Sequence, residues 1–247
     1  MRTTLKVAVL PAVFLALVSA AYADHITLDS GNGSSSSHSN GALEYLGTSP
    51  LNSSWATNLV APVNPTATSS ISKTTYDVSS AGVWTAAIAG SSWVSNTSTA
   101  GPNCSGSQCD PNDFYYYETS FTAVGGSMPY SGSLSVMADD TAEVLLNGKV
   151  IIPFGAIGND GHCSVGQPNC TYIDTISLNG TLLNAGTNWL EIIDAQTGGS
   201  AAGVDFSGSL TQDTPEPSSL LLLGTGLLGL AFGLFRKNKA SGLVQNL

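Results

Sequence analysis

The chain has 247 residues, a formal net charge of −10 and only 10% charged residues, whereas about 25% is usual in soluble proteins. The scarcity of Lys and Arg argues against nucleic-acid binding, because contacts with phosphates need a basic face. A helical bundle or coiled coil is also disfavoured, since such folds need long helical segments rich in Ala, Glu, Lys, Leu and Arg. The length fits one domain of ordinary size with tails.

The charges divide the chain into basic ends and an acidic middle. Five of the seven basic residues lie in the first six or the last twelve positions, and all seventeen acids lie between Asp24 and Glu216. That stretch contains two lysines and therefore has a net charge of −15. We interpret the ends as segments handled by a membrane and the middle as an acidic, soluble body.

Residues 1–23 have the pattern of a secretory signal peptide. Two basic residues precede an apolar run over residues 7–18, and Ala21 and Ala23 flank Tyr22 in an A-x-A cleavage site. Cleavage there would leave Asp24 as the first residue of the mature protein. The alternative is an uncleaved N-terminal anchor, which the shortness of the apolar run disfavours.

The segment 214–247 has three parts in a fixed order. A Pro-Glu-Pro triplet comes first, an uncharged apolar run over residues 218–235 follows, and a basic cluster ends the run. Eighteen residues are the short limit for a membrane helix, and basic residues behind a span keep that end in the cytoplasm. We therefore expect a membrane helix with the acidic body outside. The residues that define this tail are Pro215, Glu216, Pro217, Arg236, Lys237 and Lys239.

This tail resembles the PEP-CTERM sorting signal of exported proteins in Gram-negative bacteria that make exopolysaccharide. The resemblance implies that export machinery and an exosortase are partners, and that the membrane is reached through the C-terminal helix. It also implies a final location at the cell surface or outside the cell, in association with polysaccharide. The basic cluster here is Arg-Lys-Asn-Lys rather than a run of arginines, and residues 240–247 extend beyond it.

The middle of the chain has the pattern of an antiparallel β protein. Short runs with alternating apolar residues are separated by turn residues, and no helical segment lies between them. Asn147-Gly148 and Asn179-Gly180 each stand between apolar runs, which predicts hairpins with tight turns. We expect a β-sandwich over residues 41–213, preceded by a flexible lead-in over residues 24–40. The expected core positions include Tyr115, Tyr117, Thr119, Phe121, Leu134, Val136, Ala138, Val144, Leu146, Leu190, Ile192, Val204, Phe206 and Leu210.

The body resembles the galactose-binding-like jelly roll of carbohydrate-binding modules, on the motifs at 115–121, 134–140, 144–148 and 185–192. The Asp-Asp and Leu-Asn-Gly stretches at 139–140 and 146–148 are also similar to PA14-type lectin domains. The resemblance implies an all-β, antiparallel jelly-roll sandwich between the signal peptide and the membrane helix.

Four cysteines in an exported chain predict disulfides. We expect Cys104 to pair with Cys109 and Cys163 with Cys170, because each pair lies within one loop rich in Gly, Pro and Asn. A zinc site is the alternative. The ligand spacings fit zinc poorly, and His162 is the only additional ligand nearby.

Asp139 and Asp140 are the strongest candidate site. Adjacent carboxylates at the end of a strand can ligate Ca²⁺, and in PA14-like lectins such pairs hold calcium that contacts sugar. With Asn147 they form the candidate calcium or sugar residues. The alternative is a turn, in which the Asp side chains accept hydrogen bonds from nearby amides. Asn159-Asp160-Gly161 invites the same calcium interpretation but lacks the other ligands of an EF-hand loop.

Aromatic residues offer a second candidate contact with sugar. Trp55, Trp84, Trp93 and Trp189 could stack on sugar rings, although packing in a small β core is the alternative for each. Catalytic motifs are not evident: no G-x-S-x-G occurs, and no acid pair can be singled out for glycoside hydrolysis. We therefore expect a non-catalytic envelope or matrix protein without a required cofactor. A carbohydrate-binding module, assisted by calcium, and a secreted glycoside-active enzyme are the alternatives.

Overall fold

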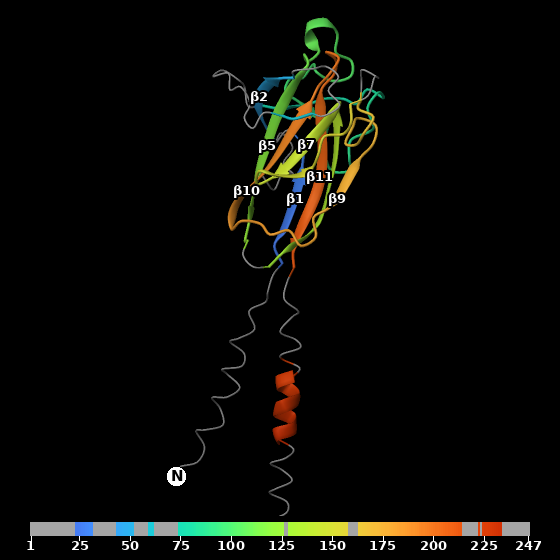
Figure 1. Cartoon of the computed structure of the whole chain (residues 1–247). Helices are drawn as coiled ribbons and strands as arrows, with labels where there is room; N and C mark the ends of the chain where they lie inside the picture. Colours follow the sequence, from blue (N-terminus) through green and yellow to red (C-terminus); the bar gives the residue numbers. More distant parts are fainter. Residues whose placement is uncertain are drawn as a thin grey trace, which may run out of the picture. The chain divides into compact units, whose positions relative to one another are not determined.

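Strands of alternating pattern assemble into two antiparallel sheets in the computed structural model of the chain (Figure 1). The structure describes residues 23–31, 43–51, 59–61, 74–125, 128–157, 163–213, 222 and 224–233. Asp24–Gln212 forms one compact unit, and the segments on either side form another. The expected all-β antiparallel sandwich is confirmed for the first of these units.

The first sheet has the strand order β3-β4-β11-β6-β9, and β1 pairs with β11. Its strands are β1 (His25–Asp29), β3 (Tyr76–Asp77), β4 (Val94–Ser95), β6 (Tyr130–Asp139), β9 (Asp174–Ser177) and β11 (Gly203–Gln212). The second sheet has the order β2-β5-β10-β7-β8. Its strands are β2 (Glu44–Pro50), β5 (Asp113–Ala123), β7 (Thr141–Leu146), β8 (Lys149–Ile152) and β10 (Gly186–Ala195), and a short 3₁₀ helix, η1 (Gly106–Gln108), precedes β5.

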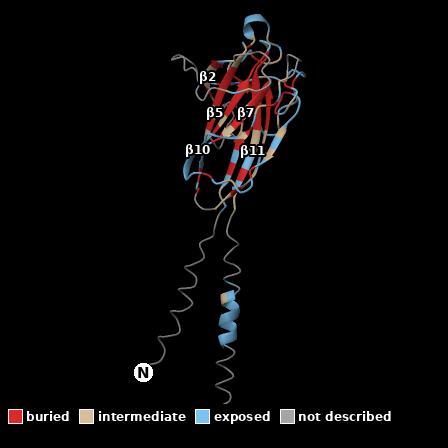
Figure 2. Ribbon diagram, viewed as in Figure 1, coloured by how far each residue is buried: buried red, intermediate tan, exposed pale blue. Residues whose placement is uncertain are grey.

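The core lies between the two sheets, where alternate residues of each strand meet (Figure 2). Burying a large apolar side chain stabilises the folded state by roughly 1.5–3 kcal/mol. Because successive strand residues point to opposite faces, the favoured strand register is the one that places the apolar residues on the inner face. The predicted core positions are confirmed as buried throughout, and Tyr117, Leu134, Ile192 and Phe206 illustrate the four central strands.

The burial of residues on the outer face of β5 and β10 was not predicted. Tyr116 and Ile193 lie on the outer face of the second sheet, yet both are buried. They pack in a second apolar cluster with Phe114 and Ala195, to which residues of the partly described 51–61 region contribute. The central strands of this sheet are therefore covered on both faces at one end.

The hairpin predicted at Asn147-Gly148 is confirmed. β7 and β8 pair with Leu146 opposite Lys149, and the two residues between them have φ values of 53° and 75°. Positive φ is what a tight type I′ turn requires, and Asn and Gly are the residues that adopt it with least strain.

The hairpin predicted at Asn179-Gly180 is wrong, although the chain does turn there. β9 pairs with β6 rather than with the residues after the turn, and Thr181 forms only an isolated bridge with Tyr130. Both sides of the turn therefore pair with β6. This strand is ten residues long and offers more backbone hydrogen-bond partners than the three apolar residues after the turn would.

The predicted flexible lead-in over residues 24–40 is wrong for its first part. Residues 25–29 form β1, which pairs with residues 207–211 of β11 and buries Ile26 and Leu28 in the core. The polar composition of the following residues concealed this short alternation, and its partner lies at the other end of the domain. Residues 32–40 lie outside the described residues.

The C-terminal unit is described only in part. Residue 222 and residues 224–233 are helical. Within the described residues, no helix has both the length and the apolar character needed to cross a membrane. The predicted span over residues 218–235 includes positions outside the described set.

Candidate functional site

Four buried acids gather at one end of the sandwich. Asp139 ends β6 and Asp140 connects it to β7 in the opposite sheet, while Asp194 lies opposite Ala142 in the pairing of β10 with β7. Asp110 precedes β5, which is the other neighbour of β10. All four side chains are buried, so strand pairing has placed a concentration of carboxylates inside the protein. We name Asp110, Asp139, Asp140 and Asp194 the acid cluster.

Asp139 and Asp140 bind segments that are distant in sequence. The indole Nε1 of Trp84 donates a hydrogen bond to Oδ2 of Asp139 at 2.6 Å. The backbone N–H of Thr197 donates to Oδ2 of Asp140 at 2.7 Å, and the Thr197 hydroxyl donates to the same oxygen. The pair does mark a change of chain direction, as the turn alternative requires, but it also ties two distant segments, at Trp84 and Thr197, to this junction.

Asp194 has the most unusual environment in the cluster. Its exposed fraction is 0%, and neither of its carboxylate oxygens accepts a hydrogen bond from any described residue. Gln196 is similar: its Nε2 donates to Thr197 O and Ser200 Oγ, whereas its Oε1 has no donor among the described residues. Three buried oxygens on one short stretch of β10 and its following loop therefore have no hydrogen-bond donor. Buried polar atoms without partners are costly and demand an explanation.

The electrostatics of the cluster are equally unfavourable. Burial raises the pKa of Asp194 well above its ordinary value, and the charges of Asp139, Asp140 and Asp110 raise it further. Burial also raises the pKa of Asp110 to about 6, opposed by a hydrogen bond from Asn96 and reinforced by Asp113. Among the described residues, the only Lys or Arg is Lys149, which begins β8 at the far end of β7.

Carboxylate and amide oxygens such as those of Asp194 and Gln196 are the ligand type that a hard divalent cation such as Ca²⁺ prefers. Their oxygens without a hydrogen-bond donor among the described residues are therefore candidate ligands. Among the described residues, the only three acids, histidines or cysteines whose ligand atoms lie within 4.8 Å of one another are Asp139, Cys163 and Cys170, so no three acids of the acid cluster converge on one point. A cation at such a buried position would stabilise the fold rather than contact a sugar, because the acid side chains are shielded from solvent.

Both predicted disulfides are present, Cys104–Cys109 and Cys163–Cys170. The sulfurs of the second pair and a carboxylate oxygen of Asp139 lie within 4.8 Å of one another. Because these sulfurs are bonded to each other, they are not the thiolates that zinc requires, and the zinc alternative is not supported. The same loop closes over the acids, where Ser164 N donates to Asp140 O at 3.1 Å.

The two disulfides should differ in their contribution to stability. We expect Cys163→Ala/Cys170→Ala to lower the free energy of unfolding by about 3 kcal/mol or more, and Cys104→Ala/Cys109→Ala by about 2 kcal/mol. Cys170 is fully buried and packs with Trp84 and Trp93, so its loss also removes packing. Urea unfolding of the two double variants measures the difference. Equal losses, or free thiols in non-reducing peptide maps of the parent protein, would contradict this account.

The remaining predicted site residues are dispersed. Asn147 lies in the β7–β8 turn at the opposite end of β7 from the acids, so the predicted grouping of Asn147 with Asp139 and Asp140 is wrong. Trp84 and Trp93 are buried against each other with ring centroids 4.4 Å apart, which removes them from any sugar platform. Trp189 is 44% exposed. Trp55 lies outside the described residues.

Several predicted positions concern processing rather than a site in the sandwich. Ala21 and the sorting residues Pro215, Glu216, Pro217, Arg236, Lys237 and Lys239 lie outside the described residues, as does the stretch Asn159-Asp160-Gly161. Asp24 is described: Tyr130 donates its hydroxyl to Oδ2 of Asp24 at 2.7 Å, and Gln212 N donates to Asp24 O at 2.8 Å. The predicted first residue of the mature chain is thus bound to the fold, while cleavage before it stays a prediction.

Sequence reasoning missed Asp194, Asp110 and Gln196, although one signal for Asp194 was present. The core-facing residues of β10 are Leu190 and Ile192, and the next residue with the same orientation is Asp194, because alternate strand residues share a face. A carboxylate in a core-facing position is rarely buried without a partner. No comparable local pattern distinguishes Asp110 or Gln196.

Comparisons with solved structures give only distant similarities. A family 35 carbohydrate-binding module from Clostridium thermocellum is 15% identical with a TM-score of 0.28, covering 49% of this chain and 78% of that one. A CBM35 from Paenibacillus barcinonensis is 16% identical with a TM-score of 0.25, covering 57% and 99%. A GH26-CBM35 β-(1,4)-mannanase from Podospora anserina is 16% identical with a TM-score of 0.30, covering 78% of this chain but only 28% of the mannanase. Scores of this size carry no functional conclusion.

The C-terminal segment gives a clearer result. No curated protein matches the sequence, but residues 213–237 match the PEP-CTERM protein-sorting motif. The match spans the Pro-Glu-Pro triplet, the apolar run and the first two residues of the basic cluster. The chain therefore carries a PEP-CTERM sorting motif behind its β-sandwich.

Proposed function

We propose that this chain is an exported, envelope-associated protein that an exosortase sorts through its C-terminal motif, and that its jelly-roll sandwich is a non-catalytic body. The observation that carries the proposal is the sorting motif at residues 213–237. It agrees with the signal-peptide pattern before Asp24 and with disulfides, which persist in oxidising compartments. The body would lie outside the cytoplasm, first held by the C-terminal helix and then released to the surface.

The sandwich would acquire a calcium ion once it is outside the cell. Asp194 and Gln196 would hold it together with one carboxylate of the Asp139–Asp140 pair, and the ion would supply the positive charge that the acid cluster lacks. Isolated buried carboxylates are strongly destabilising, so the folded state would depend on the ion more than on any single hydrogen bond. Extracellular calcium modules bind with dissociation constants of roughly 10⁻⁴–10⁻³ M, which suits an exported protein.

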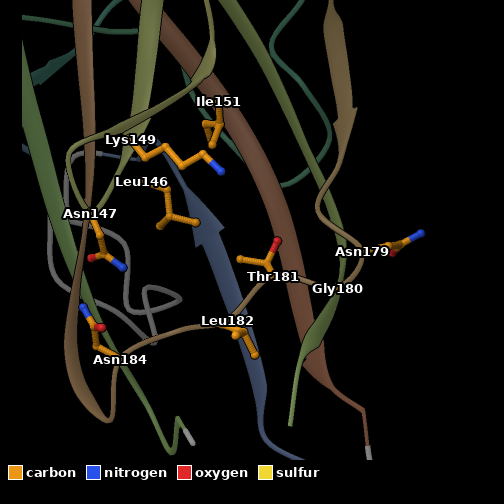
Figure 3. A pocket seen from close by; sticks show the side chains of 9 residues that line it. All are labelled: Leu146, Asn147, Lys149, Ile151, Asn179, Gly180, Thr181, Leu182 and Asn184. Atoms are coloured by element: carbon orange, nitrogen blue, oxygen red, sulfur yellow. The ribbon is translucent and has the colours of Figure 1, made fainter. Parts of the chain in front are cut away.

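A non-catalytic role agrees with the closure of the acid cluster. Glycoside hydrolysis needs two carboxyl groups that face one substrate, whereas the four carboxyl groups of the acid cluster are buried. Association with polysaccharide is the second role that we consider. An open cavity of about 560 Å³, whose lining includes Asn147, Lys149 and Leu182, favours it (Figure 3). Such a role would make the protein a component of an extracellular matrix.

Sorting is tested by mass spectrometry of the surface form in a host that expresses an exosortase. We expect an N-terminus at Asp24 and a C-terminus near residues 215–219. Replacing Arg236, Lys237 and Lys239 by Ala should weaken membrane retention, because basic residues behind a span fix its orientation. Asn238→Ala is the matched control, since it changes the same cluster without changing its charge. An intact tail on the surface form would refute the proposal.

A further inference from the structure

Two exposed Asn-Gly pairs lie close together in the fold, yet the surroundings of their side chains differ. Asn147-Gly148 joins β7 to β8, Asn179-Gly180 lies shortly after β9, and both asparagines line the cavity shown in Figure 3. In such a pair the backbone nitrogen of the glycine can attack the side-chain amide carbon of the asparagine, because glycine has no side chain that blocks the approach. The environment of each asparagine therefore decides whether this reaction proceeds in the folded protein.

The side chain of Asn147 is held at both of its polar atoms. Its Oδ1 accepts a hydrogen bond from Trp189 N at 2.9 Å, and its Nδ2 donates to Asn188 Oδ1 at 2.9 Å. Asn188 is fully buried, and the backbone N–H of Asn147 also donates to Trp189 O at 2.9 Å. Rotation of the amide toward Gly148 would break both side-chain bonds, so the fold protects this asparagine.

The side chain of Asn179 is much less restrained. It is exposed and extends away from the cavity (Figure 3). Its Oδ1 accepts from Gly132 N at 3.2 Å, whereas its Nδ2 donates to no described residue. This nitrogen is the leaving group, so no hydrogen bond with a described residue has to break before it departs. The N–H of Gly132 lies beside the oxygen on which negative charge develops during the attack, and a donor in that position stabilises an oxyanion.

The nucleophile in this pair, the backbone nitrogen of Gly180, is equally accessible. Gly180 has a φ of 77°, and no atom outside its chain neighbours lies within 4 Å of the position that a Cβ would occupy. Its N–H donates to no described residue. The turn is closed by a hydrogen bond from Thr181 N to Leu178 O at 3.3 Å. The peptide between Asn179 and Gly180 lies in the middle of this turn, so it can rotate toward the side chain while the closing bond persists.

We infer that Asn179 is a site of spontaneous modification, at which the folded protein converts asparagine to aspartate and isoaspartate. The nitrogen of Gly180 attacks Cγ of Asn179, and the new C–N bond closes a succinimide ring. The bond from Cγ to Nδ2 breaks, the proton of the Gly180 amide passes through water to Nδ2, and ammonia leaves. Water then adds to either carbonyl of the ring, which opens to aspartate or to isoaspartate. The reaction needs water alone and involves no oxidation or reduction.

Both products change this end of the sandwich. Each places a carboxylate where the asparagine was neutral, and therefore adds a negative charge to a cavity whose lining includes Lys149. Isoaspartate also lengthens the main chain between two anchored points, where Leu178 N donates to Gly132 O at 3.0 Å and Tyr130 N donates to Thr181 O at 2.7 Å. We expect the isoaspartate form to lose the contact between Tyr130 and Thr181 and the aspartate form to keep it.

The test is incubation of the purified full chain at mildly alkaline pH, followed over time by peptide mapping with mass spectrometry. We expect Asn179 to deamidate at least about tenfold faster than Asn147, because two side-chain hydrogen bonds hold only the latter. In urea these bonds are absent, so the two sites should react at similar rates. Asn179→Ser should abolish the acidic form that accumulates on ion exchange, and Asn179→Asp should elute where that form does.

The alternatives give different maps. Equal rates at the two sites in the folded chain, or reaction at Asn147 alone, would overturn the assignment. An Asn179 that reacts in urea but stays intact in the folded chain would overturn it too, because the turn would then protect both asparagines. Asn179→Ser removes an exposed side chain, so a folded variant is expected, and the comparison in urea needs no variant. Since the purified chain is measured without an exosortase, the result is independent of sorting.

Discussion

Calcium should raise the midpoint temperature of the wild-type chain and should have no such effect on Asp194→Asn. An ion that binds only the folded state stabilises it by about 2.7 kcal/mol at 100 times its dissociation constant. For a domain of this size, in which 1 kcal/mol shifts the midpoint by about 2–4 °C, that gain corresponds to a shift of about 5–11 °C. Asp194 is the decisive residue because both of its buried oxygens lack a donor among the described residues. Differential scanning calorimetry of the purified full chain, with calcium and with chelator, measures the effect.

The variant also makes a prediction in the absence of calcium. In chelator, Asp194→Asn should be at least as stable as the wild type, because an amide buries no charge beside Asp139 and Asp140. Asp77→Asn is the matched control, since Asp77 is an exposed acid on β3 and its loss should not affect the calcium response. A flat calcium titration of the wild type would instead favour a purely structural turn at Asp139 and Asp140. A calcium response that survives in Asp194→Asn would place the cation elsewhere.

The pH dependence of stability should reverse in sign when calcium is removed. Burial raises the pKa of Asp110 to about 6 and that of Asp194 well above its ordinary value. An acid whose pKa is higher in the folded state binds its proton more tightly there than in the unfolded chain. In chelator, stability should therefore fall as pH rises from about 4 through 6 and beyond. With saturating calcium it should rise over the same range, because protonation of the ligands expels the ion.

Thermal unfolding at pH 5 and pH 7.5, with and without calcium, tests this reversal. Burial also raises the pKa values of Asp113, Glu143 and Asp205, and these groups contribute a slope of the same sign in chelator. The double variant Asp110→Asn/Asp194→Asn separates the cluster from them, since it should flatten most of the slope in chelator and remove the calcium effect. Parallel pH profiles with and without calcium would contradict a cation in the acid cluster.

The sequence by itself determined the features that depend on neighbouring residues. The strands around residues 115–121, 134–138 and 204–210 follow from alternation, since a period of two places one set of side chains on one face. The β7–β8 turn follows from Asn147-Gly148, and both disulfides follow from cysteines within single loops. The sorting tail was evident for the same reason: its three parts lie consecutively in the chain.

The tertiary structure alone decided which of these features meet. Asp139 and Asp140 look like an isolated pair in the sequence, and only the pairing of β10 with both β5 and β7 brings Asp194 and Asp110 to them. Asn147, which the sequence grouped with the pair, is separated from it by the length of β7. Strand β1 was hidden because its partner, β11, lies at the far end of the domain. Pairing between distant strands depends on the whole sandwich, so no local pattern of residues encodes it.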